Sequence, residues 1–250
     1  MKLKLRKLSI VLVALVVLLT AGCSAKTRPP STDYGAGGVY HDDQHGFKIN
    51  FTSEWKNHKT TSEGWTASNG ESGPGVRFRK ATNEVKVTGI VVRIFTVQQW
   101  NALQNNEFTV KGAQPRLELR ARNAKYVFLL DWGATLTGIS DTVDVENMIH
   151  NTRAFQVASM GVIPEEGAEE IVREALKEYP YSLDSAFPIL DIRRNADTQY
   201  AGQDCYSYTA VENGNENNCL VTKETGVVYR FNPSKNKYGM LCPGVPLIYQ

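Results

Sequence analysis

The sequence predicts a mixed α+β fold in which antiparallel sheets predominate, and three observations lead to this expectation. Apolar and polar residues alternate over residues 47–51 and 76–79, as they do in strands that bury one face. Residues 88–97 and 126–130 are continuous apolar runs, which are typical of central strands covered on both sides. After residue 160, a helical repeat precedes three short apolar segments, and this order predicts a helix followed by a β-meander.

The first predicted folded region spans residues 39–158 and is rich in strands. Besides the segments above, we expect a short helix over residues 97–105 and a strand over residues 117–121, where apolar and polar residues alternate. The region closes with an amphipathic helix expected over residues 144–155, because the apolar residues there share one helical face and Asp144 suits the N-cap.

The second predicted folded region is a small α+β domain over residues 159–250. Pro164, Glu165 and Glu166 favour a helix start, since Pro is tolerated in the first turn and acids complement the helix dipole. Apolar residues then recur at helical spacing up to Leu176. Strands are expected over residues 204–211, 219–223 and 227–231, with turns at residues 212–218 and 224–226.

Part of the first region resembles the PsbP-like family. The resemblance rests on Tyr40, on the Gly-Phe-Lys-Ile-Asn-Phe segment at residues 46–51, on Trp55, and on the strand-rich body and terminal helix that follow. It implies an α/β/α sandwich around an antiparallel sheet and covers about half of the chain. The family often has Pro shortly before its Trp, where this chain has Thr-Ser-Glu at residues 52–54. The plant members serve photosystem II, and that role does not transfer with the fold.

The second region resembles PepSY-like and related small envelope domains of bacteria. The residues that carry this resemblance are Tyr206 and Tyr208 on one expected strand, Val221 on the next, and the Thr-Gly-Val-Val-Tyr segment at residues 225–229. Some relatives are thought to inhibit peptidases or to modulate partners, so the resemblance implies a binding role.

Residues 1–22 have the pattern of a targeting segment. A basic stretch with Lys2, Lys4, Arg6 and Lys7 precedes ten apolar residues at positions 10–19. A membrane-spanning helix needs roughly 20 apolar residues, so the run suits a cleaved signal peptide better than a permanent anchor.

The end of this segment, Leu-Thr-Ala-Gly-Cys at residues 19–23, resembles the lipobox of bacterial lipoproteins. The family more often has Leu where this chain has Thr20. The resemblance implies cleavage after Gly22, diacylation of the Cys23 thiol and anchoring to the cell membrane or the outer membrane on the extracytoplasmic side. Residues 23–38 are rich in Pro, Gly, Ser and Thr, which predicts a flexible tether between the anchor and the folded regions.

The remaining cysteines are Cys205, Cys219 and Cys242. An exported protein meets conditions in which disulfides persist. Cys205 and Cys219 lie on consecutive expected strands at similar distances from Glu212, so folding the hairpin there would place them opposite each other. We therefore favour a Cys205–Cys219 bond. Pairing of either with Cys242, or three reduced thiols, stays open.

The charge of the chain gives no support to a nucleic-acid partner. The formal charge of +2 includes the four basic residues of the targeting segment; without them, 24 Lys and Arg face 26 Asp and Glu, a balance of −2. A short basic strip contains Arg116, Arg120, Arg122 and Lys125, but Glu118 interrupts it and strand alternation explains it.

One cluster has the composition of a metal site. His41, Asp43 and His45 carry imidazole and carboxylate ligands, with His58 as a third imidazole donor. The cluster precedes the first expected strand, where polar residues usually cover an exposed strand entry, so we expect neither a metal nor another cofactor.

No motif with a complete catalytic arrangement occurs in the sequence. The glycine-rich stretch at residues 70–75 fails the nucleophile-elbow pattern at Pro74, and His150 is the only histidine after His58 that could serve a cysteine nucleophile. We therefore expect no enzymatic activity.

Several aromatic residues could line a groove for a peptide or glycan, although burial in the core explains most of them more simply. These residues are Trp65, Trp100, Trp132, Tyr206, Tyr208 and Tyr229. The sequence thus predicts a lipid-anchored binding or assembly module of the cell envelope. The alternatives are an extracytoplasmic peptidase inhibitor or modulator and a metal-dependent envelope enzyme.

Overall fold

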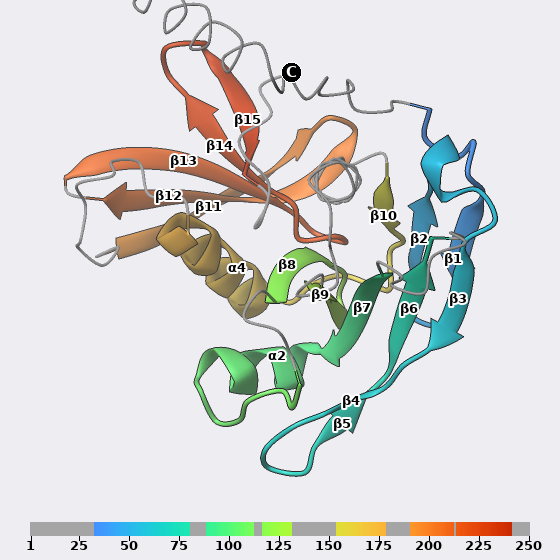
Figure 1. Cartoon of the computed structure of the whole chain (residues 1–250). Helices are drawn as coiled ribbons and strands as arrows, with labels where there is room; N and C mark the ends of the chain where they lie inside the picture. The colour runs from blue at the N-terminus through green and yellow to red at the C-terminus, as the bar shows by residue number, and fades with distance from the viewer. Residues whose placement is uncertain are drawn as a thin grey trace, which may run out of the picture. The chain divides into compact units, whose positions relative to one another are not determined.

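The computed structural model describes residues 33–80, 89–112, 117–131, 154–178, 191–212 and 214–241 (Figure 1). Antiparallel strands make up most of this part of the chain, and its two α-helices are α2 (Val97–Gln104) and α4 (Glu165–Glu178). The mixed α+β class predicted from the sequence is confirmed. Within the same ranges, neither helix is long and apolar enough to cross a bilayer. The targeting segment and Cys23 lie outside the described residues.

A five-stranded antiparallel sheet forms the centre of the first region. Its order is β3-β6-β7-β9-β8, with bounds β3 (Lys59–Ser62), β6 (Gly75–Arg79), β7 (Gly89–Thr96), β9 (Tyr126–Asp131) and β8 (Leu117–Arg122). The two continuous apolar runs became β7 and β9, whose residues are buried on both faces of the sheet. The alternating segments became β6 and β8 nearer its edges, as their patterns predict.

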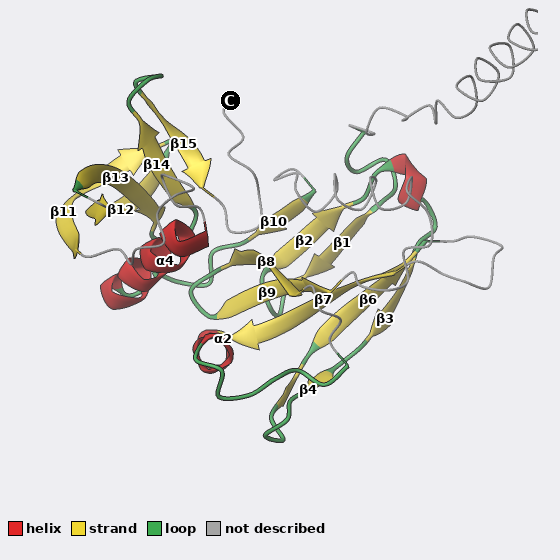
Figure 2. Cartoon of the chain, turned by 60° about the vertical axis from the view of Figure 1, so that its left-hand side comes forward, coloured by secondary structure: helices red, strands yellow, loops and turns green. Residues whose placement is uncertain are grey.

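A smaller sheet covers one face of the five-stranded sheet (Figure 2). Its order is β1-β2-β10, with bounds β1 (Val39–Asp42), β2 (Phe47–Asn50) and β10 (Phe155–Val157). Phe47 and Phe155 point from the smaller sheet into one core with Phe78 and Phe128 of the larger sheet. The helix expected over residues 144–155 lies outside the described residues up to position 153, and Phe155 begins a strand instead.

The other face of the five-stranded sheet packs against α2 and a hairpin that contains β4 (Trp65–Thr66) and β5 (Ser72–Gly73). Trp65 stacks on Phe95 with ring centroids 4.1 Å apart, and its indole Nε1 donates to the Ile94 carbonyl at 2.9 Å. Thr96 and Gln99 form a capping box that starts α2 directly after β7. The predicted helix over residues 97–105 is thereby confirmed.

The second region is a helix on a five-stranded meander. The strands run in sequence order and are β11 (Asp191–Tyr200), β12 (Gln203–Glu212), β13 (Asn215–Thr222), β14 (Val228–Asn232) and β15 (Lys237–Leu241). The apolar stripe of α4 packs on β12, β13 and β14. The three predicted strands are confirmed as β12, β13 and β14, whereas β11 and β15 were not foreseen.

The face of this sheet that points away from α4 carries an aromatic cluster. Tyr200 contacts both Tyr229 and Tyr238, with ring centroids 4.8 Å and 5.3 Å apart. Cys205, Leu220 and Met240 belong to the same cluster. Contacts group Ser31–Gln250 into a single unit, and the two regions meet beside this aromatic face.

Candidate functional site

A cavity of about 250 Å³ lies where β8, β10 and the C-terminal sheet meet. We call it the joint pocket. It is lined by residues 119–122 of β8 and residues 155–157 of β10. The C-terminal sheet and its β13–β14 turn contribute Gln203, Thr225, Gly226, Val227, Tyr229 and Met240.

The walls of the joint pocket are mainly apolar. Phe155 and Val157 line it from β10, while Val227, Tyr229 and Met240 line it from the aromatic face of the C-terminal sheet. Five polar residues also belong to its lining, namely Arg120, Arg122, Gln156, Gln203 and Thr225. A mainly apolar cavity with a few polar groups is the usual composition of a ligand site.

Glu174 on α4 fixes the two regions against each other beside the pocket. Its carboxylate accepts from Arg122 Nη2 at 2.8 Å and from the Trp100 indole Nε1 at 3.0 Å. Burial lowers the pKa of Arg122, and the charge of Glu174 opposes that shift. Because Arg122 lines the pocket and Glu174 holds its guanidinium, one carboxylate fixes part of the pocket wall.

Gly226 brings the β13–β14 turn into contact with the same arginine. Its φ of +62° lies in the left-handed region, and a Cβ built there would lie 2.9 Å from Arg122 Cδ and 3.2 Å from Ile163 Cδ1. Only glycine suits both the backbone conformation and this close approach.

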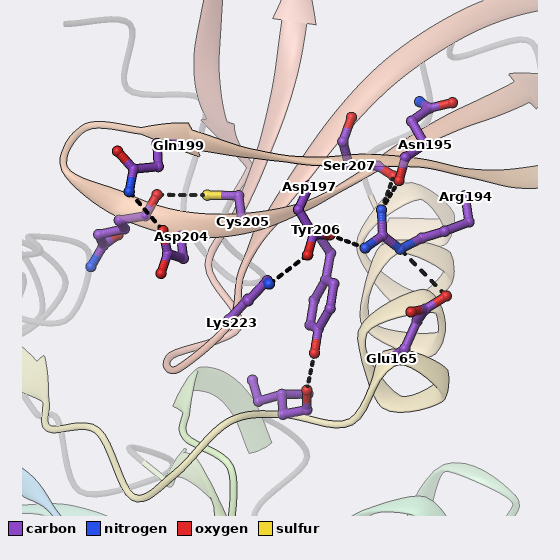
Figure 3. Close-up of polar contacts among 12 residues, drawn as sticks. Glu165, Arg194, Asn195, Asp197, Gln199, Asp204, Cys205, Tyr206, Ser207 and Lys223 are labelled. Carbon is purple, nitrogen blue, oxygen red and sulfur yellow. Dashed lines mark hydrogen bonds and ion pairs between the residues drawn. The ribbon is translucent and has the colours of Figure 1, made fainter.

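A polar network holds the base of that turn (Figure 3). Lys223 Nζ donates to Asp197 Oδ2 at 2.6 Å, and Arg194 forms an ion pair with the same carboxylate. Both cations flank the ring of Tyr206, at 4.9 Å for Lys223 and 5.0 Å for Arg194. These hydrogen bonds, the one from Lys223 foremost, hold the pKa of Asp197 below its usual value.

The network ties the β13–β14 turn to β11 and to the segment directly before α4. Asp197 lies in an irregular part of β11 where the register shifts between Asn195 and Thr198, and the Tyr206 hydroxyl donates to the Ile163 carbonyl at 2.8 Å. The turn that begins at Lys223 is thus fixed at its base, and its next residues line the joint pocket.

The candidate metal ligands His41, Asp43 and His45 do not come together. His45 is buried and its Nδ1 lies 2.9 Å from Asp42 Oδ2, while its ring packs edge-on against Tyr126. His41 and Asp43 are exposed. The described ranges contain no group of three His, Cys, Asp or Glu residues arranged to hold a metal ion.

The expected Cys205–Cys219 bond is wrong. The β12–β13 hairpin pairs Glu212 with Asn215, so Cys219 lies opposite Tyr208 and Cys205 lies opposite Thr222. This register places the two thiols on opposite faces of the sheet, because side chains alternate along a strand. Accordingly they belong to different cores, and no disulfide joins them. Burial raises the pKa of the Cys205 thiol. Cys242 lies outside the described residues.

Of the aromatic residues considered from the sequence, Tyr229 alone among those described lines the joint pocket. Trp65, Trp100, Tyr206 and Tyr208 are buried in the two cores instead. Trp132 lies outside the described residues. In the basic strip, Arg120 and Arg122 line the pocket, and the Arg120 guanidinium lies 5.5 Å from the Phe155 ring centre.

Sequence reasoning missed most of the pocket. Phe155 was assigned to a helix, Gly226 was placed in a turn without a part in any site, and Met240 was not singled out. The only local sign of the pocket in the sequence was a glycine directly after polar turn residues. The reason is that the pocket lies where strands distant in sequence meet. Comparison with protein-family models, with curated proteins and with solved structures finds no match for this chain.

Proposed function

We propose that this chain is a lipid-anchored, non-catalytic binding protein of the bacterial cell envelope, and that its ligand occupies the joint pocket. The observation that carries the proposal is the pocket itself, an apolar cavity with a few polar groups whose wall is held in place by Glu174 and Arg122. A preformed wall favours binding, since little ordering has to accompany it.

The proposed anchor is the diacylated Cys23 thiol. Its support is the order of basic residues, apolar residues and small residues before that cysteine. Two or three acyl chains hold a protein stably on a bilayer, because each buried methylene contributes about 0.8 kcal/mol.

Metabolic labelling with alkyne-tagged palmitate tests the anchor in cells that produce the full chain. The native protein should take up label and sediment with membranes, whereas Cys23→Ser should lose the label and change its processing. Equal labelling of both proteins would overturn the lipid anchor while leaving the pocket unaffected.

We propose further that residues 39–158 are PsbP-like and that residues 159–250 are a second domain. The support is the antiparallel sheet of the first region and the helix with its own core in the second.

The pocket is tested with a small apolar ligand and methyl NMR. The chain has four methionines, and Met240 lines the pocket, whereas Met160 lies beside Gly46. N-acetyl-leucine methylamide, titrated into the full chain in deuterated detergent, should shift the Met240 methyl signal saturably and leave that of Met160 unchanged. Equal shifts of both signals, or no shift of Met240, would refute the pocket as a ligand site.

A further inference from the structure

We propose that a second cavity, beside α2, binds a neutral saccharide. The cavity has a volume of about 610 Å³ and lies between α2 and the β4–β5 hairpin, which are neighbours in the fold (Figure 1). Among the described residues, none lines both this cavity and the joint pocket. We call it the amide cavity, because four of its nine described lining residues are Gln98, Gln99, Asn101 and Asn105. A site here goes beyond the proposed function, which concerns the joint pocket.

Hydrogen bonds between distant segments hold the two sides of the amide cavity together. Gln99 joins them, since its Nε2 donates to the Ser72 carbonyl at 3.2 Å and its Oε1 accepts from the Thr96 amide at 3.1 Å. The segment after α2 is also tied to the hairpin. The Ser68 amide donates to the Thr109 carbonyl at 2.8 Å, and the Thr109 amide donates to Ser68 Oγ at 2.9 Å. The cavity is therefore preformed, which lowers the ordering that has to accompany binding.

The lining of the amide cavity is polar almost throughout. Besides the four amides it contains the hydroxyl groups of Ser72 and Thr96 and the carboxylates of Glu71 and Glu107, and Ala102 is the only apolar residue among the described ones. Sites for drug-sized ligands are lined mainly by apolar side chains, so this composition disfavours an apolar ligand. None of the described lining residues is Lys, Arg or His. An anionic ligand would therefore meet two carboxylates without a compensating cation.

The amides match a ligand whose polar groups donate as well as accept hydrogen bonds. Each Asn or Gln side chain has two N–H donors and a carbonyl acceptor, and a hydroxyl group likewise acts in both ways. Gln98 and Asn101 are exposed and lie three residues apart on α2, so they are neighbours on one side of the helix. Both line the cavity. A saccharide carries hydroxyl groups around its rings and can therefore bind several of these amides at once.

The two carboxylates keep acceptor capacity for a saccharide. Glu107 Oε1 accepts from Asn105 Nδ2 at 3.4 Å, and Glu71 Oε1 accepts from Asn69 Nδ2 at 3.3 Å. A carboxylate has about four lone-pair sites, so each can still accept from a ligand hydroxyl group. These contacts also fix the side chains in place at the cavity wall.

The size of the amide cavity suits an organic ligand rather than a metal ion. Its volume of about 610 Å³ lies within the roughly 300–1,000 Å³ typical of small-molecule sites. In the described part of the chain, no three His, Cys, Asp or Glu residues are arranged to hold a metal ion. The ligand class that agrees with the size, the polarity and the charge of this cavity is a neutral saccharide.

The experiment applies the full chain in nanodiscs to an array of immobilised oligosaccharides that are neutral, anionic or amino-bearing. A neutral oligosaccharide should bind most tightly. Its affinity, measured by titration calorimetry, should change by less than about twofold between low and high salt, because salt screens interactions between charges. Tightest binding of an anionic or amino-bearing oligosaccharide, or no binding to the array, would overturn the proposal.

Matched variants on α2 locate the saccharide. Gln98→Ala and Gln104→Ala each remove one exposed glutamine amide of the same helix, but only Gln98 lines the cavity. Gln98→Ala should weaken the array-selected oligosaccharide by about three- to tenfold, and adding Asn101→Ala should weaken it further by a similar factor, because each change removes hydrogen bonds. Gln104→Ala should bind as the native protein does. Unfolding midpoints of all variants identify any loss that comes from misfolding, and equal affinities of all variants would contradict the site.

The two cavities can be tested independently of each other. Val157→Arg places a charge in the joint pocket and should leave the affinity for the oligosaccharide unchanged, and the oligosaccharide should not shift the Met240 methyl signal. An oligosaccharide that shifts Met240 and binds Gln98→Ala as tightly as the native protein would occupy the joint pocket. That result would overturn the saccharide site beside α2 and leave the proposed function intact.

Discussion

At the scale of single residues, the five-stranded sheet buries two oppositely charged side chains that form an ion pair. Arg93 on β7 and Asp131 on β9 are 6% and 7% exposed, and their charged atoms lie 2.5 Å apart. They share the sheet face with Trp65 and α2. A nearby pair, Arg77 with Glu63, lies at the partly exposed end of the same face, and its hydrogen bonds lower the pKa of Glu63.

The buried pair makes Asp131 a sensitive position. Asp131→Ala leaves the Arg93 guanidinium buried without its carboxylate, so the free energy of unfolding should fall by about 3–5 kcal/mol in urea titrations. The double variant Arg93→Met with Asp131→Leu should recover most of that loss. Asp191→Ala breaks an exposed pair with Arg193 and should barely change the unfolding midpoint. A comparable loss in both alanine variants would contradict the importance of burial.

Tyr208 gives the fold a dependence on alkaline pH. Burial raises the pKa of Tyr208 to about 12, whereas an unfolded tyrosine ionises near pH 10. Between these values the unfolded chain loses a proton that the folded chain keeps, so raising the pH favours unfolding. The contribution is complete below pH 10 and is lost as the pH rises towards 12.

Tyr208→Phe should therefore flatten the fall in unfolding free energy between pH 10 and about pH 12. The slope should not vanish, because burial also raises the pKa of Tyr40 and of Tyr238. Urea titrations at several alkaline pH values measure it. Identical slopes for the variant and the native protein would rule out this assignment.

At the scale of elements, the β13–β14 turn connects the cores to the joint pocket. The Thr222 hydroxyl accepts from the Val227 amide at 2.8 Å and lies 2.8 Å from the Thr225 hydroxyl, which closes the turn locally. Gly226 then contacts Arg122 of β8. The conformation of the turn is thus stabilised locally by its hydroxyl contacts. It is also stabilised by Arg122, which belongs to another sheet.

Two glycine substitutions separate these causes. Gly226→Ala and Gly202→Ala both force alanine to a positive φ, at +62° and +76°, but only Gly226 has atoms in the way of a Cβ. Each should lose about 1–2 kcal/mol for the backbone conformation. Gly226→Ala should lose more, and it should also weaken ligand binding measured at the Met240 methyl signal. Equal effects of the two substitutions would show that contact with Arg122 is unimportant.

Helices and strands were predicted correctly from the sequence wherever burial of one face gave the apolar residues a regular spacing. β6, β7, β9 and α4 each carry an apolar pattern that their packing explains. β11 carries none, because most of its residues are exposed. Glu212 pairs with Asn215 and is not the centre of the β12–β13 turn, so the strand pairing differs from the expected one by three residues. Such an odd shift moves side chains to the other face. That error led to the expected Cys205–Cys219 pair. The pocket could not be predicted from the sequence, because it depends on contacts between sheets.

At the scale of the whole molecule, Glu174 links the core beneath α4 to the first region through its hydrogen bonds with Trp100 and Arg122. The first region has its cores on the two faces of the five-stranded sheet, and the second has its own beneath α4. Trp100 and Arg122 belong to the first region and Glu174 to the second. The contacts of Glu174 with Trp100 and Arg122 should therefore decide whether the two regions unfold together.

Two probes can follow the regions separately. All four tryptophans precede residue 133, whereas Cys205 and Cys219 lie in the second region and are buried. Tryptophan fluorescence and pulsed alkylation of the two cysteines, mapped by mass spectrometry, should give coincident urea transitions in the native protein. Glu174→Ala should separate them and lower stability by about 3–5 kcal/mol, since it leaves Arg122 buried without its partner.

The matched control is Glu169→Ala on the same helix, whose partner Arg173 is partly exposed. It should keep the two transitions together. Separate transitions in the native protein would mean that the contacts of Glu174 do not couple the two regions. Coincident transitions in Glu174→Ala would mean that other contacts couple them.

The irregular part of β11 has a consequence for proteins held side by side on a surface. β11 has ten residues, is mostly exposed and is the terminal strand of its sheet among those described. A long regular edge of this kind would invite copies crowded in two dimensions to polymerise edge to edge. The register shift between Asn195 and Thr198 interrupts that edge, and the Asp197 ion pairs with Arg194 and Lys223 hold charge beside it. The same contacts that fix the turn should therefore keep copies of the protein from forming fibres at the high density that the proposed lipid anchor would produce.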